Sequence, residues 1–374
     1  MEKVKLKEIL EVRRGTSLSG KYYSKDGELI RLTLGNFNYP GYGFKENTSK
    51  EDTYFNGEVK QQYILKKGDI ITPLTEQVSG LLGETATIPE NNKYIQSGDI
   101  GLVIPKEEKL DKRFAYYLIS SSMIKKQLDV SSQQTKIRHT SPDKIKDCIA
   151  WIPEKSRQVK IAKILDEIND AIDKNSQINN NLEEFAFTIF LHDFSNKAPN
   201  GKIGDIIIEK PKSNIKVGEA KEIKGSYPFF TSGDSIFEWN DYAVDGRNLF
   251  LNTGGNADVK FYVGKAMYST DTWCISTDYN LSDYLYLYFK SIKNELDRKF
   301  FHGSGLKHLQ KQLLKQEKLY IPSDEELKEF NKQVQAMFDT IAKNKIENNK
   351  LTDLKNFLLP LLMNGQINVD DIEI

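Results

Sequence analysis

The segment from Gly15 to Tyr22 comes closest to a catalytic motif, because its glycines and Lys21 have nearly the spacing of a phosphate-binding loop. Such a loop needs a short Ser or Thr hydroxyl after the lysine to reach magnesium, and here Tyr22 stands at that position. The residues from Tyr23 to Gly27 favour a turn rather than the helix that a phosphate-binding loop opens. Nucleotide hydrolysis at this segment is therefore not expected.

No other constellation in the sequence predicts catalysis or metal binding. The four histidines, at positions 139, 192, 302 and 308, lack metal-ligand spacing, and Cys148 and Cys274 lie one in each half. Neither a Gly-rich dinucleotide fingerprint nor an Asn-Pro-Pro-aromatic methyltransferase tetrad occurs. We therefore predict a chain with no catalytic residue, no metal site and no cofactor of its own.

Cations and aromatic residues are instead gathered where they suit a nucleic acid. Arg13, Arg14, Lys21 and Tyr22 lie in or beside one Gly-containing loop, and side chains of these types make contacts to phosphates and bases. A solvated loop would have the same composition, so both interpretations stay open.

Amide and cationic side chains also recur upstream of an Ile-Pro pair in each half. The residues are Gln133, Gln134, Lys136 and Arg138 in the first half, and Lys307 and His308 in the second. Such groups read adenine and guanine edges and grip the phosphate backbone, so we predict DNA contacts here. Gln77, Asn252 and Asn256, in turn-rich loops, are further candidates for contacts to base edges.

The elements that must position these residues occur twice. The Ile-Pro pairs end at positions 153 and 322, and the helical segments behind them align without a gap at this constant offset of 169. Ile161 then matches Phe330, and Asn175 matches Asn344. A chain built as two similar halves is typical of a protein that reads something with two halves.

Both helical segments have the alternating steps of four and three of a coiled-coil seam. The first seam comprises Ile161, Leu165, Ile168, Ile172, Asn175, Asn179, Leu182, Ala186 and Ile189. The second comprises Phe330, Val334, Met337, Ile341, Asn344, Asn348, Leu351, Lys355 and Leu358. Lys355 interrupts the second seam, and Leu354 beside it can shift the apolar stripe. A capping box of Ser323 and Glu326 should begin this helix and Gly365 should end it, with Pro360 weakening its last turn.

Asn175 and Asn344 each lie at the middle of a seam, where an unanswered amide costs stability. If the helices pack antiparallel, these midpoints meet, and the asparagines can satisfy one another and fix the register. Exposed asparagines would explain the pattern without any pairing. A helix of ~40 residues is ~60 Å long, so such a pair would hold two globular units ~12–18 base pairs of duplex DNA apart.

The globular segments predict α+β units of similar plan. Short β-rich runs at 68–72, 100–104 and 248–252 alternate with turns, and helical stretches follow at 114–128 and 283–300. We expect two α/β recognition domains separated by two long antiparallel coiled-coil helices, in a pseudo-twofold repeat. The expected divisions are domain 1 (1–152), central helix (153–196), domain 2 (197–322), distal helix (323–364) and tail (365–374).

Composition sets the class and the compartment. With 374 residues, of which 39% are hydrophobic, the chain can bury more than one core. No signal peptide or apolar membrane-spanning run is present, so we expect a cytoplasmic protein that does not contact a membrane. The 53 basic and 53 acidic residues balance, which permits only a local basic face for DNA.

The helices resemble those of a known family, the specificity subunits of type I restriction-modification systems. The run from Ile152 to Leu165, with Ile172 to Asn175 and Asn181 to Glu184, is similar to the family's central helical region, and Pro322 to Leu351 is similar to its distal copy. The likeness covers essentially the whole chain. One departure is Leu327, which stands where the first copy has Gln158.

The resemblance implies two target recognition domains, each reading one half of a split duplex DNA target. It also implies two DNA methyltransferase subunits docked on the helices and a motor subunit that cleaves unmodified DNA. S-adenosylmethionine would then belong to the methyltransferase, and ATP and magnesium to the nuclease. Two alternatives remain: a coiled-coil adaptor that binds protein without DNA specificity, and a single-subunit nuclease or methyltransferase, for which the sequence offers no core.

Overall fold

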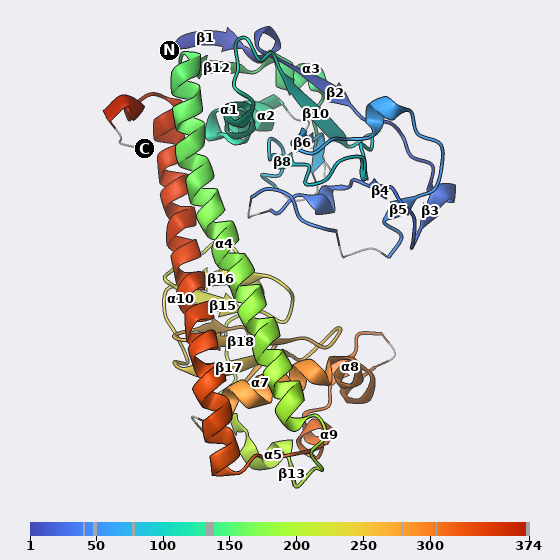
Figure 1. Cartoon of the computed structure of the whole chain (residues 1–374), viewed down its shortest axis with the longest axis vertical. Coiled ribbons are helices and arrows are strands. Elements are labelled where there is room, and N and C mark those ends of the chain that lie inside the picture. Colours follow the sequence, from blue (N-terminus) through green and yellow to red (C-terminus); the bar gives the residue numbers. More distant parts are fainter. Residues whose placement is uncertain are drawn as a thin grey trace. The chain divides into compact units, whose positions relative to one another are not determined.

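The computed structural model describes residues 1–39, 42–47, 51–76, 79–131, 138–278, 280–303 and 305–371. The chain forms two compact units, which we call unit 1 (Met1–Asp170 with Leu351–Ile374) and unit 2 (Ala171–Lys350). The helices α4 (Lys155–Phe194) and α10 (Asp324–Met363) each contribute a segment to both units, and they run side by side (Figure 1).

Unit 1 is built on a four-stranded antiparallel sheet with strand order β2-β10-β6-β8. Its strands are β2 (Leu10–Arg14), β6 (Ile70–Pro73), β8 (Ala86–Thr87) and β10 (Ile100–Pro105). Both faces of β6 are buried: Ile70 packs in the core that includes the helices, and its neighbour Ile71 packs in a second core on the opposite face. This double burial explains why the neighbouring residues Ile70 and Ile71 are both apolar.

Smaller elements complete unit 1. The paired strands are β1 (Glu2–Lys5) with β12 (Ile149–Ile152), β7 (Thr75–Glu76) with β11 (Arg138–His139), and a sheet of β3 (Tyr23–Ser24), β5 (Tyr54–Phe55), β4 (Ile30–Arg31) and β9 (Tyr94–Ile95). The helices are α1 (Lys112–Ser120), α2 (Ser122–Ser131) and α3 (Pro142–Asp147). Asp111 caps α1 by accepting from the Arg113 and Phe114 amides at 3.0 Å.

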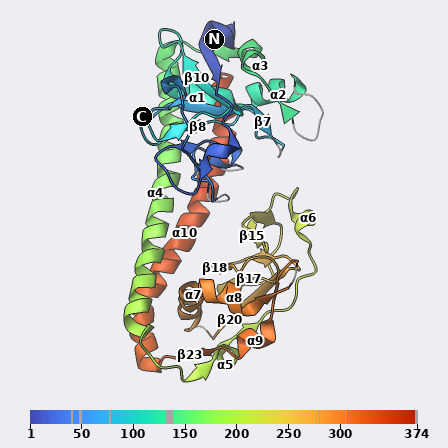
Figure 2. The ribbon, with the colours of Figure 1, turned by 90° about the vertical axis from the view of Figure 1, so that its right-hand side faces the viewer.

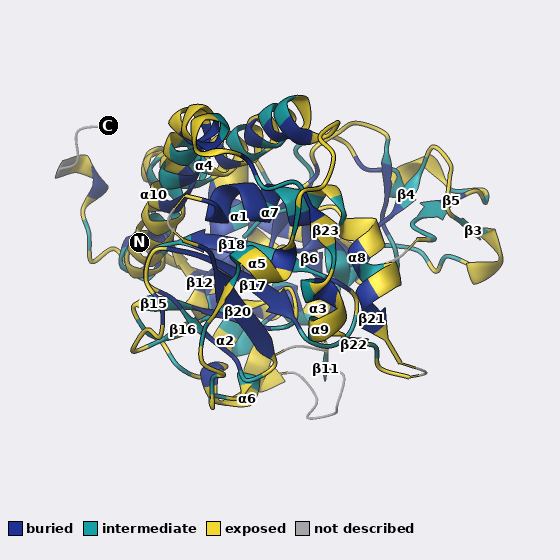
Figure 3. Ribbon diagram, turned by 90° about the horizontal axis from the view of Figure 1, so that it is seen from below, coloured by how far each residue is buried: buried dark blue, intermediate teal, exposed yellow. Residues whose placement is uncertain are grey.

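Unit 2 has the same plan. Its sheet has the order β14-β20-β17-β18, from β14 (Ile208–Glu209), β17 (Arg247–Asn252), β18 (Val259–Val263) and β20 (Thr272–Ser276). The strands β17 and β20 are fully buried, as the dark ribbons of Figure 3 show. The other strands are β13 (Gly201–Lys202), β15 (Tyr227–Phe230), β16 (Ile236–Trp239), β19 (Met267–Tyr268), β21 (Phe301–His302), β22 (His308–Leu309) and β23 (Lys318–Leu319). The helices are α5 (Ile203–Ile206), α6 (Val217–Ala220), α7 (Ser282–Ser291), α8 (Lys293–Phe300) and α9 (Lys311–Lys315), and α7 lies against β17 and β18 (Figure 2).

The two topologies confirm the predicted internal repeat. In both four-stranded sheets the strand order is the same, and β4–β9 in unit 1 and β15–β19 in unit 2 are the corresponding parallel pairs. Each unit also closes by pairing its first strand with the strand before a long helix, β1 with β12 and β13 with β23. The predicted helical stretches at 114–128 and 283–300 are each broken into two helices.

The long helices pack antiparallel, and their asparagines form hydrogen bonds with one another, but not in the expected pairs. Asn175 donates to Asn348 Oδ1 at 3.0 Å, and Asn344 donates to Asn179 Oδ1 at 2.9 Å. The expected contact between Asn175 and Asn344 is therefore wrong, because Asn175 faces position 348 instead of 344. A shift of four residues is one step of the seam, so the apolar contacts alone permit either register.

Lys355 stays in the seam, and Leu354 does not shift the apolar stripe. The side chain of Leu354 is 45% exposed, whereas Lys355 is 1% exposed. The Lys355 ammonium donates to Asn169 Oδ1 at 2.6 Å and lies 3.1 Å from the centroid of the Tyr42 ring. A buried lysine is tolerated here because a polar acceptor and an aromatic face both receive its charge.

The ends of the helical segments also follow the sequence. Ser323 and Glu326 form the predicted capping box, with the Ser323 amide donating to Glu326 Oε2 at 2.9 Å. Gly365 follows α10 with φ +73, which is the left-handed conformation expected at this position. Pro360 lies inside α10 without ending it.

Gln158 has no counterpart in the second half. In unit 1 its buried side chain forms hydrogen bonds to backbone groups. It is 1% exposed, its Oε1 accepts from the Asp111 amide at 2.8 Å, and its Nε2 donates to the carbonyl of Pro153 at 2.9 Å. Leu327 at the matching position is also buried. The departure from the repeat therefore changes an internal contact.

Arg247 ties the sheet of unit 2 to α10. Its guanidinium donates to Asp283 Oδ1 on α7 at 2.7 Å and to Asp339 on α10, and Asp283 is 1% exposed. Burial raises the pKa of Asp283 to about 6, although the Arg247 charge opposes this shift.

Candidate nucleic-acid interface

The loop that joins β17 to β18 in unit 2 carries two of the predicted residues. Asn252 is 3% exposed, and its amide donates to the carbonyls of Gly254, at 2.8 Å, and Asn256. Its Oδ1 accepts from the Asp258 amide at 2.8 Å. Asn252 therefore shapes the loop from inside, and Asn256 is exposed on it.

The β21–β22 hairpin lies against this loop and brings Lys307 and His308 to it. The Gly255 amide donates to the Lys307 carbonyl at 3.0 Å, and the Leu309 amide donates to the Thr253 carbonyl at 3.1 Å. His308 is exposed. The Lys307 ammonium, in contrast, donates a hydrogen bond to the Asp297 carboxylate at 2.7 Å. This hydrogen bond lowers the pKa of Asp297. Four predicted residues from two separate stretches thus form one cluster.

Unit 1 has an equivalent pairing at the equivalent place. The strand β7, which follows the central strand β6, pairs with β11, so that Glu76 faces Arg138 and Thr75 faces His139. Arg138 forms ion pairs with Glu76, which is 2% exposed, and with Asp129. The guanidinium is thus held by carboxylates. Gln77, Gln133, Gln134 and Lys136 lie outside the described residues, on the chain segments that adjoin this pairing.

The predicted cations at the start of unit 1 differ in their surroundings. Arg13 on β2 donates to the carbonyl of Gln62 at 2.8 Å, whereas Arg14 is exposed and has no hydrogen-bond or ion-pair partner among the described residues. The Lys21 ammonium lies 4.5 Å from the centroid of the Tyr22 ring, which is 41% exposed. Within the described parts of unit 1, no hydrogen bond or ion pair joins these residues to the β7–β11 pairing.

Three lysines between β14 and α6 in unit 2 were not among the predicted residues. Lys210, Lys212 and Lys216 have no ion-pair partner in the described part of the chain, and Lys212 and Lys216 are exposed. A hydrogen bond from the Thr270 amide to the Ile215 carbonyl, at 2.8 Å, holds their segment in place. The next residue, Asp271, accepts a hydrogen bond from the Thr253 amide of the β17–β18 loop through its carbonyl. Lysines at close spacing without an intervening acid are the signal that identifies this segment in the sequence.

The described residues hold neither a metal-binding cluster nor a membrane-spanning helix. No group of three or more His, Cys, Asp or Glu side chains with metal-binding geometry occurs among them. None of the helices in this part of the chain combines the length and the apolar character needed to cross a bilayer.

Comparison with known proteins assigns the family. The profile of the Type I restriction modification DNA specificity domain matches residues 1–184 and again residues 198–356. The Type I restriction enzyme MjaVIII specificity subunit of Methanocaldococcus jannaschii is 27% identical over 173 residues, which cover 45% of this chain. The match spans 40% of that protein's length.

The fold is also known from a solved structure. The crystal structure of the Type-I restriction-modification system S subunit from M. genitalium superposes with a TM-score of 0.57 at 15% identity, over 97% of this chain and 96% of that chain. The predicted α+β architecture, with two recognition domains and two long packed helices, is confirmed. The predicted family, that of the type I restriction-modification specificity subunits, is confirmed by the profile. The chain belongs to the type I restriction-modification DNA specificity family, with one copy of the family's domain in each half.

Proposed function

We propose that this chain is the specificity subunit of a type I restriction-modification complex and that each unit reads one half of a bipartite duplex DNA target. The observation that carries the proposal is the recurring loop pairing. In unit 1 β7 pairs with β11, and in unit 2 the loop after β17 pairs with β22, on sheets of the same order. Both places carry a cationic side chain that the sequence singled out, Arg138 in unit 1 and Lys307 in unit 2.

The roles of the side chains follow from their surroundings. Exposed cations without a described partner, such as Arg14, Lys212 and Lys216, would contact phosphates and position each unit on the duplex. Exposed polar groups at the paired loops, such as Asn256 and His308, would contact base edges. Arg138 and Asn252 would act indirectly, because their polar atoms hold the loops.

The helices are proposed to set the gap between the half-sites. Each has 40 residues, which corresponds to about 60 Å of helix. Because the half-buried asparagine pairs fix one register of α4 against α10, this length would act as a stiff linker. Two modest half-site affinities are then multiplied when both sites are reached together.

The helices are also proposed to dock the methyltransferase subunits. Phe185 on α4 and Leu354 on α10 occupy the same position of the repeat, at the offset of 169, and their side chains are 56% and 45% exposed. Large apolar side chains at equivalent exposed positions fit two copies of one partner. S-adenosylmethionine, ATP and magnesium would be bound by partner subunits.

Methylation mapping tests the proposal directly. The chain is co-expressed with the candidate adenine methyltransferase subunit of its source, and methylated adenines are mapped across the host DNA by long-read sequencing. We expect a split motif with a fixed gap that is absent without this chain. Replacing residues 253–256 should alter one half of the motif and leave the other half unchanged.

The outcomes separate the proposal from the adaptor alternative. A stable complex without methylation, together with DNA affinity that does not fall steeply with salt, would favour a protein-binding adaptor. Failure to form any complex with the methyltransferase would contradict the assignment as a subunit.

A further inference from the structure

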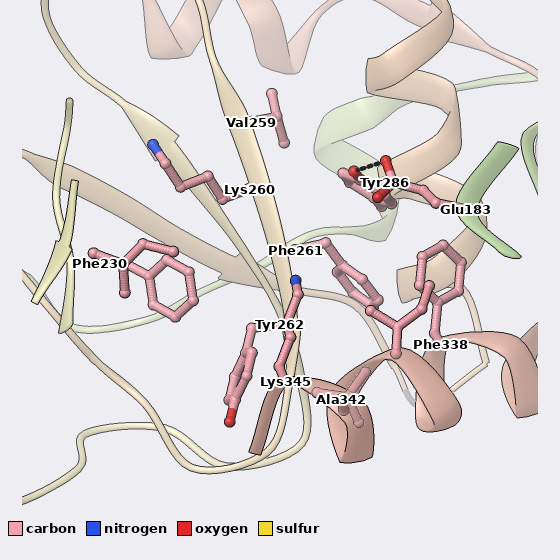
Figure 4. Close-up of a pocket in the computed structure, with 13 residues that line it drawn as sticks. Glu183, Phe230, Val259, Lys260, Phe261, Tyr262, Tyr286, Phe338, Ala342 and Lys345 are labelled. Carbon is pink, nitrogen blue, oxygen red and sulfur yellow. Dashed lines mark hydrogen bonds between the residues drawn. The ribbon is translucent and has the colours of Figure 1, made fainter. Parts of the chain in front are cut away.

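A cavity of about 250 Å³ lies in unit 2, between the β17–β18 hairpin and the segments of α4 and α10 in that unit (Figure 4). Its walls are formed by side chains from β15, β16, β18, α4, α7 and α10. The residues used below are Phe261 and Tyr262 on β18, Tyr286 on α7, Glu183 on α4, and Phe338 and Lys345 on α10.

Aromatic rings that contact one another form much of the walls. The Phe261 ring stacks on Tyr286 with a centroid distance of 5.0 Å, and it meets the edge of Phe338 at the same distance. On the other side, Tyr262 lies 5.6 Å from Phe230. Interlocked aromatic rings keep such a space open, since filling it would require several rings to move together.

Two of the three charged side chains that line the cavity are satisfied. Glu183 accepts from the Tyr286 hydroxyl and the Lys290 ammonium, both at 2.6 Å. Burial opposes ionisation of Glu183, but these bonds outweigh it and lower its pKa. Lys260 pairs with Asp258 at 2.9 Å.

Lys345 is the third, and it has no hydrogen-bond or ion-pair partner among the described residues. Lys345 lines the cavity together with Phe261 and Tyr262, all three of which are labelled in Figure 4. The residue as a whole is exposed, yet desolvation by the surrounding groups lowers the pKa of its ammonium, and Glu183 offsets only part of this. A cation placed beside apolar walls without a counterion is the complement of an anion with an apolar body.

The open edge of β18 adds hydrogen-bond donors. The Asn252 amide donates to the Asp258 carbonyl and the Gly264 amide to the Gly246 carbonyl, so the even-numbered residues of β18 bond to β17. In an antiparallel pair the alternate residues then point their backbone groups away from the partner strand. These are Val259, Phe261 and Val263, which all line the cavity.

We propose that this cavity binds a small amphipathic monocarboxylate, with the carboxylate at Lys345 and an aromatic or short aliphatic body between the rings of β18 and α10. An apolar cavity of about 150 Å³ accommodates benzene, so this one has room for a ring with a short chain. One unpaired cation beside the Glu183 carboxylate favours a single negative charge over a phosphate dianion. The site lies outside the candidate DNA interface and serves neither of the roles proposed above.

The position of the site gives an occupant a route to the DNA-reading loop. Val259 and Lys260 follow Asp258 directly, and the Asp258 amide holds Asn252, which shapes the loop. A ligand that braces the start of β18 therefore acts one residue away from that hydrogen bond.

The test compares three probes of one shape on the full chain: 4-phenylbutyrate, 4-phenylbutanol and 4-phenylbutylamine, with affinities measured by calorimetry. We expect the carboxylate to bind the wild-type chain at least about tenfold more tightly than the alcohol, and the amine to bind least. Lys345→Met should reduce carboxylate affinity about tenfold or more and leave alcohol affinity unchanged. Lys343→Met, an exposed lysine on the same helix that does not line the cavity, is the matched control.

The outcomes decide between an anion site and a plain cavity. Equal affinity for the carboxylate and the alcohol, or tighter binding of the amine, would overturn the proposal. So would the absence of saturable carboxylate binding at millimolar concentration, or a Lys343→Met effect as large as that of Lys345→Met. The three probes decide the question on the wild-type chain even if a variant does not fold. Ala342→Phe, which fills the cavity from α10, should abolish carboxylate binding in a folded variant.

Discussion

Asn175 on α4 donates a hydrogen bond to Asn348 on α10, and four residues further along α4 the pair of Asn179 and Asn344 repeats the contact in the opposite direction. The two amide pairs occupy seam positions that would otherwise hold leucine or isoleucine. Each pair is satisfied only in this register, so the polar contacts select one alignment among those that the apolar seam permits.

The pair of Asn179 and Asn344 should show strong coupling in a double-mutant cycle. Asn179→Leu leaves the Asn344 amide without its acceptor and should destabilise the chain by about 1–3 kcal/mol. Asn179→Leu combined with Asn344→Leu should recover most of that loss, because two leucines pack in the seam. Chemical denaturation measures the coupling, and Asn180→Leu, an exposed neighbour, is the control. Additive single effects would show that the pair is not coupled.

The buried pair of Lys355 and Asn169 in unit 1 should be replaceable by alanine and phenylalanine, the residues at the matching positions of unit 2. The offset of 169 relates Asn169 to Phe338 and Ala186 to Lys355, and Ala186 and Phe338 are both buried. Lys355→Ala should cost about 1–3 kcal/mol, because Asn169 loses its donor. Combining it with Asn169→Phe should restore part of this stability, as measured by thermal unfolding. If the double variant loses more stability than the two single variants together, these positions of the two units are not equivalent.

Asp283 should make stability fall as the pH rises. Its pKa is raised from 3.8 to about 6 in the folded chain, so its contribution is fully present below pH 3.8 and is lost as the pH passes through about 6. The shift corresponds to at most about 3 kcal/mol. Relative to the wild type, Asp283→Asn should therefore gain stability between pH 4 and 7, in denaturation curves at each pH. A constant difference across this range would contradict the assignment.

Arg14 and Arg138 should affect DNA binding in different ways. Arg14→Ala should weaken binding to all sequences and reduce the salt slope by about 1, as expected for one phosphate contact. Arg138→Ala removes the counterion of the buried Glu76 and should lower the unfolding midpoint of the chain. Affinity measured over a salt series, together with thermal unfolding, separates the two effects. An unchanged salt slope in Arg14→Ala would remove that residue from the interface.

Phe185 and Leu354 should each control the binding of one methyltransferase subunit. A charged residue at an apolar contact should weaken one of two binding events by about 2 kcal/mol or more, roughly 30-fold. Native mass spectrometry should then show one bound subunit for Phe185→Glu, one for Leu354→Glu and none for the double variant. Thr188→Glu, an exposed position on α4, is the control. Retention of two subunits by both single variants would place docking elsewhere.

Helix length should set the gap in the target. Inserting seven residues into both α4 and α10 keeps the seam in phase and adds about 10 Å, or about three base pairs. We expect methylation mapping to show the same half-sites with a longer gap. An unchanged gap would contradict the role of the helices as a spacer.

The sequence predicted the elements well where the signal is periodic or local. The offset of 169 revealed the repeat, and the capping box of Ser323 with Glu326 marked the start of α10. The partners of Asn175 were not predictable, because a seam that repeats every three or four residues fits several registers. The burial of Lys355 depends on Asn169 and Tyr42, which are remote in the chain.

The candidate site shows the same limit. Sequence position identified Asn252 and Lys307 as candidates, but their types alone gave no sign that Asn252 is an internal brace or that Lys307 bonds Asp297. Their adjacency arises from the backbone pairing of Gly254 with His308, which joins distant segments. Whether a side chain is free or engaged is decided by such non-local contacts.

The loop pairings are made by backbone atoms: Thr253 with Leu309 and Gly255 with Lys307 in unit 2, and Glu76 with Arg138 in unit 1. Exposed side chains on these ladders can therefore be exchanged while the main chain keeps its course. If each half reads its own half-site, as proposed above, each half can acquire a new target by a few point changes, independently of the other half. A lineage with several versions of each half would then have as many targets as the product of the two repertoires, and exchanging one half would change the target of the complex.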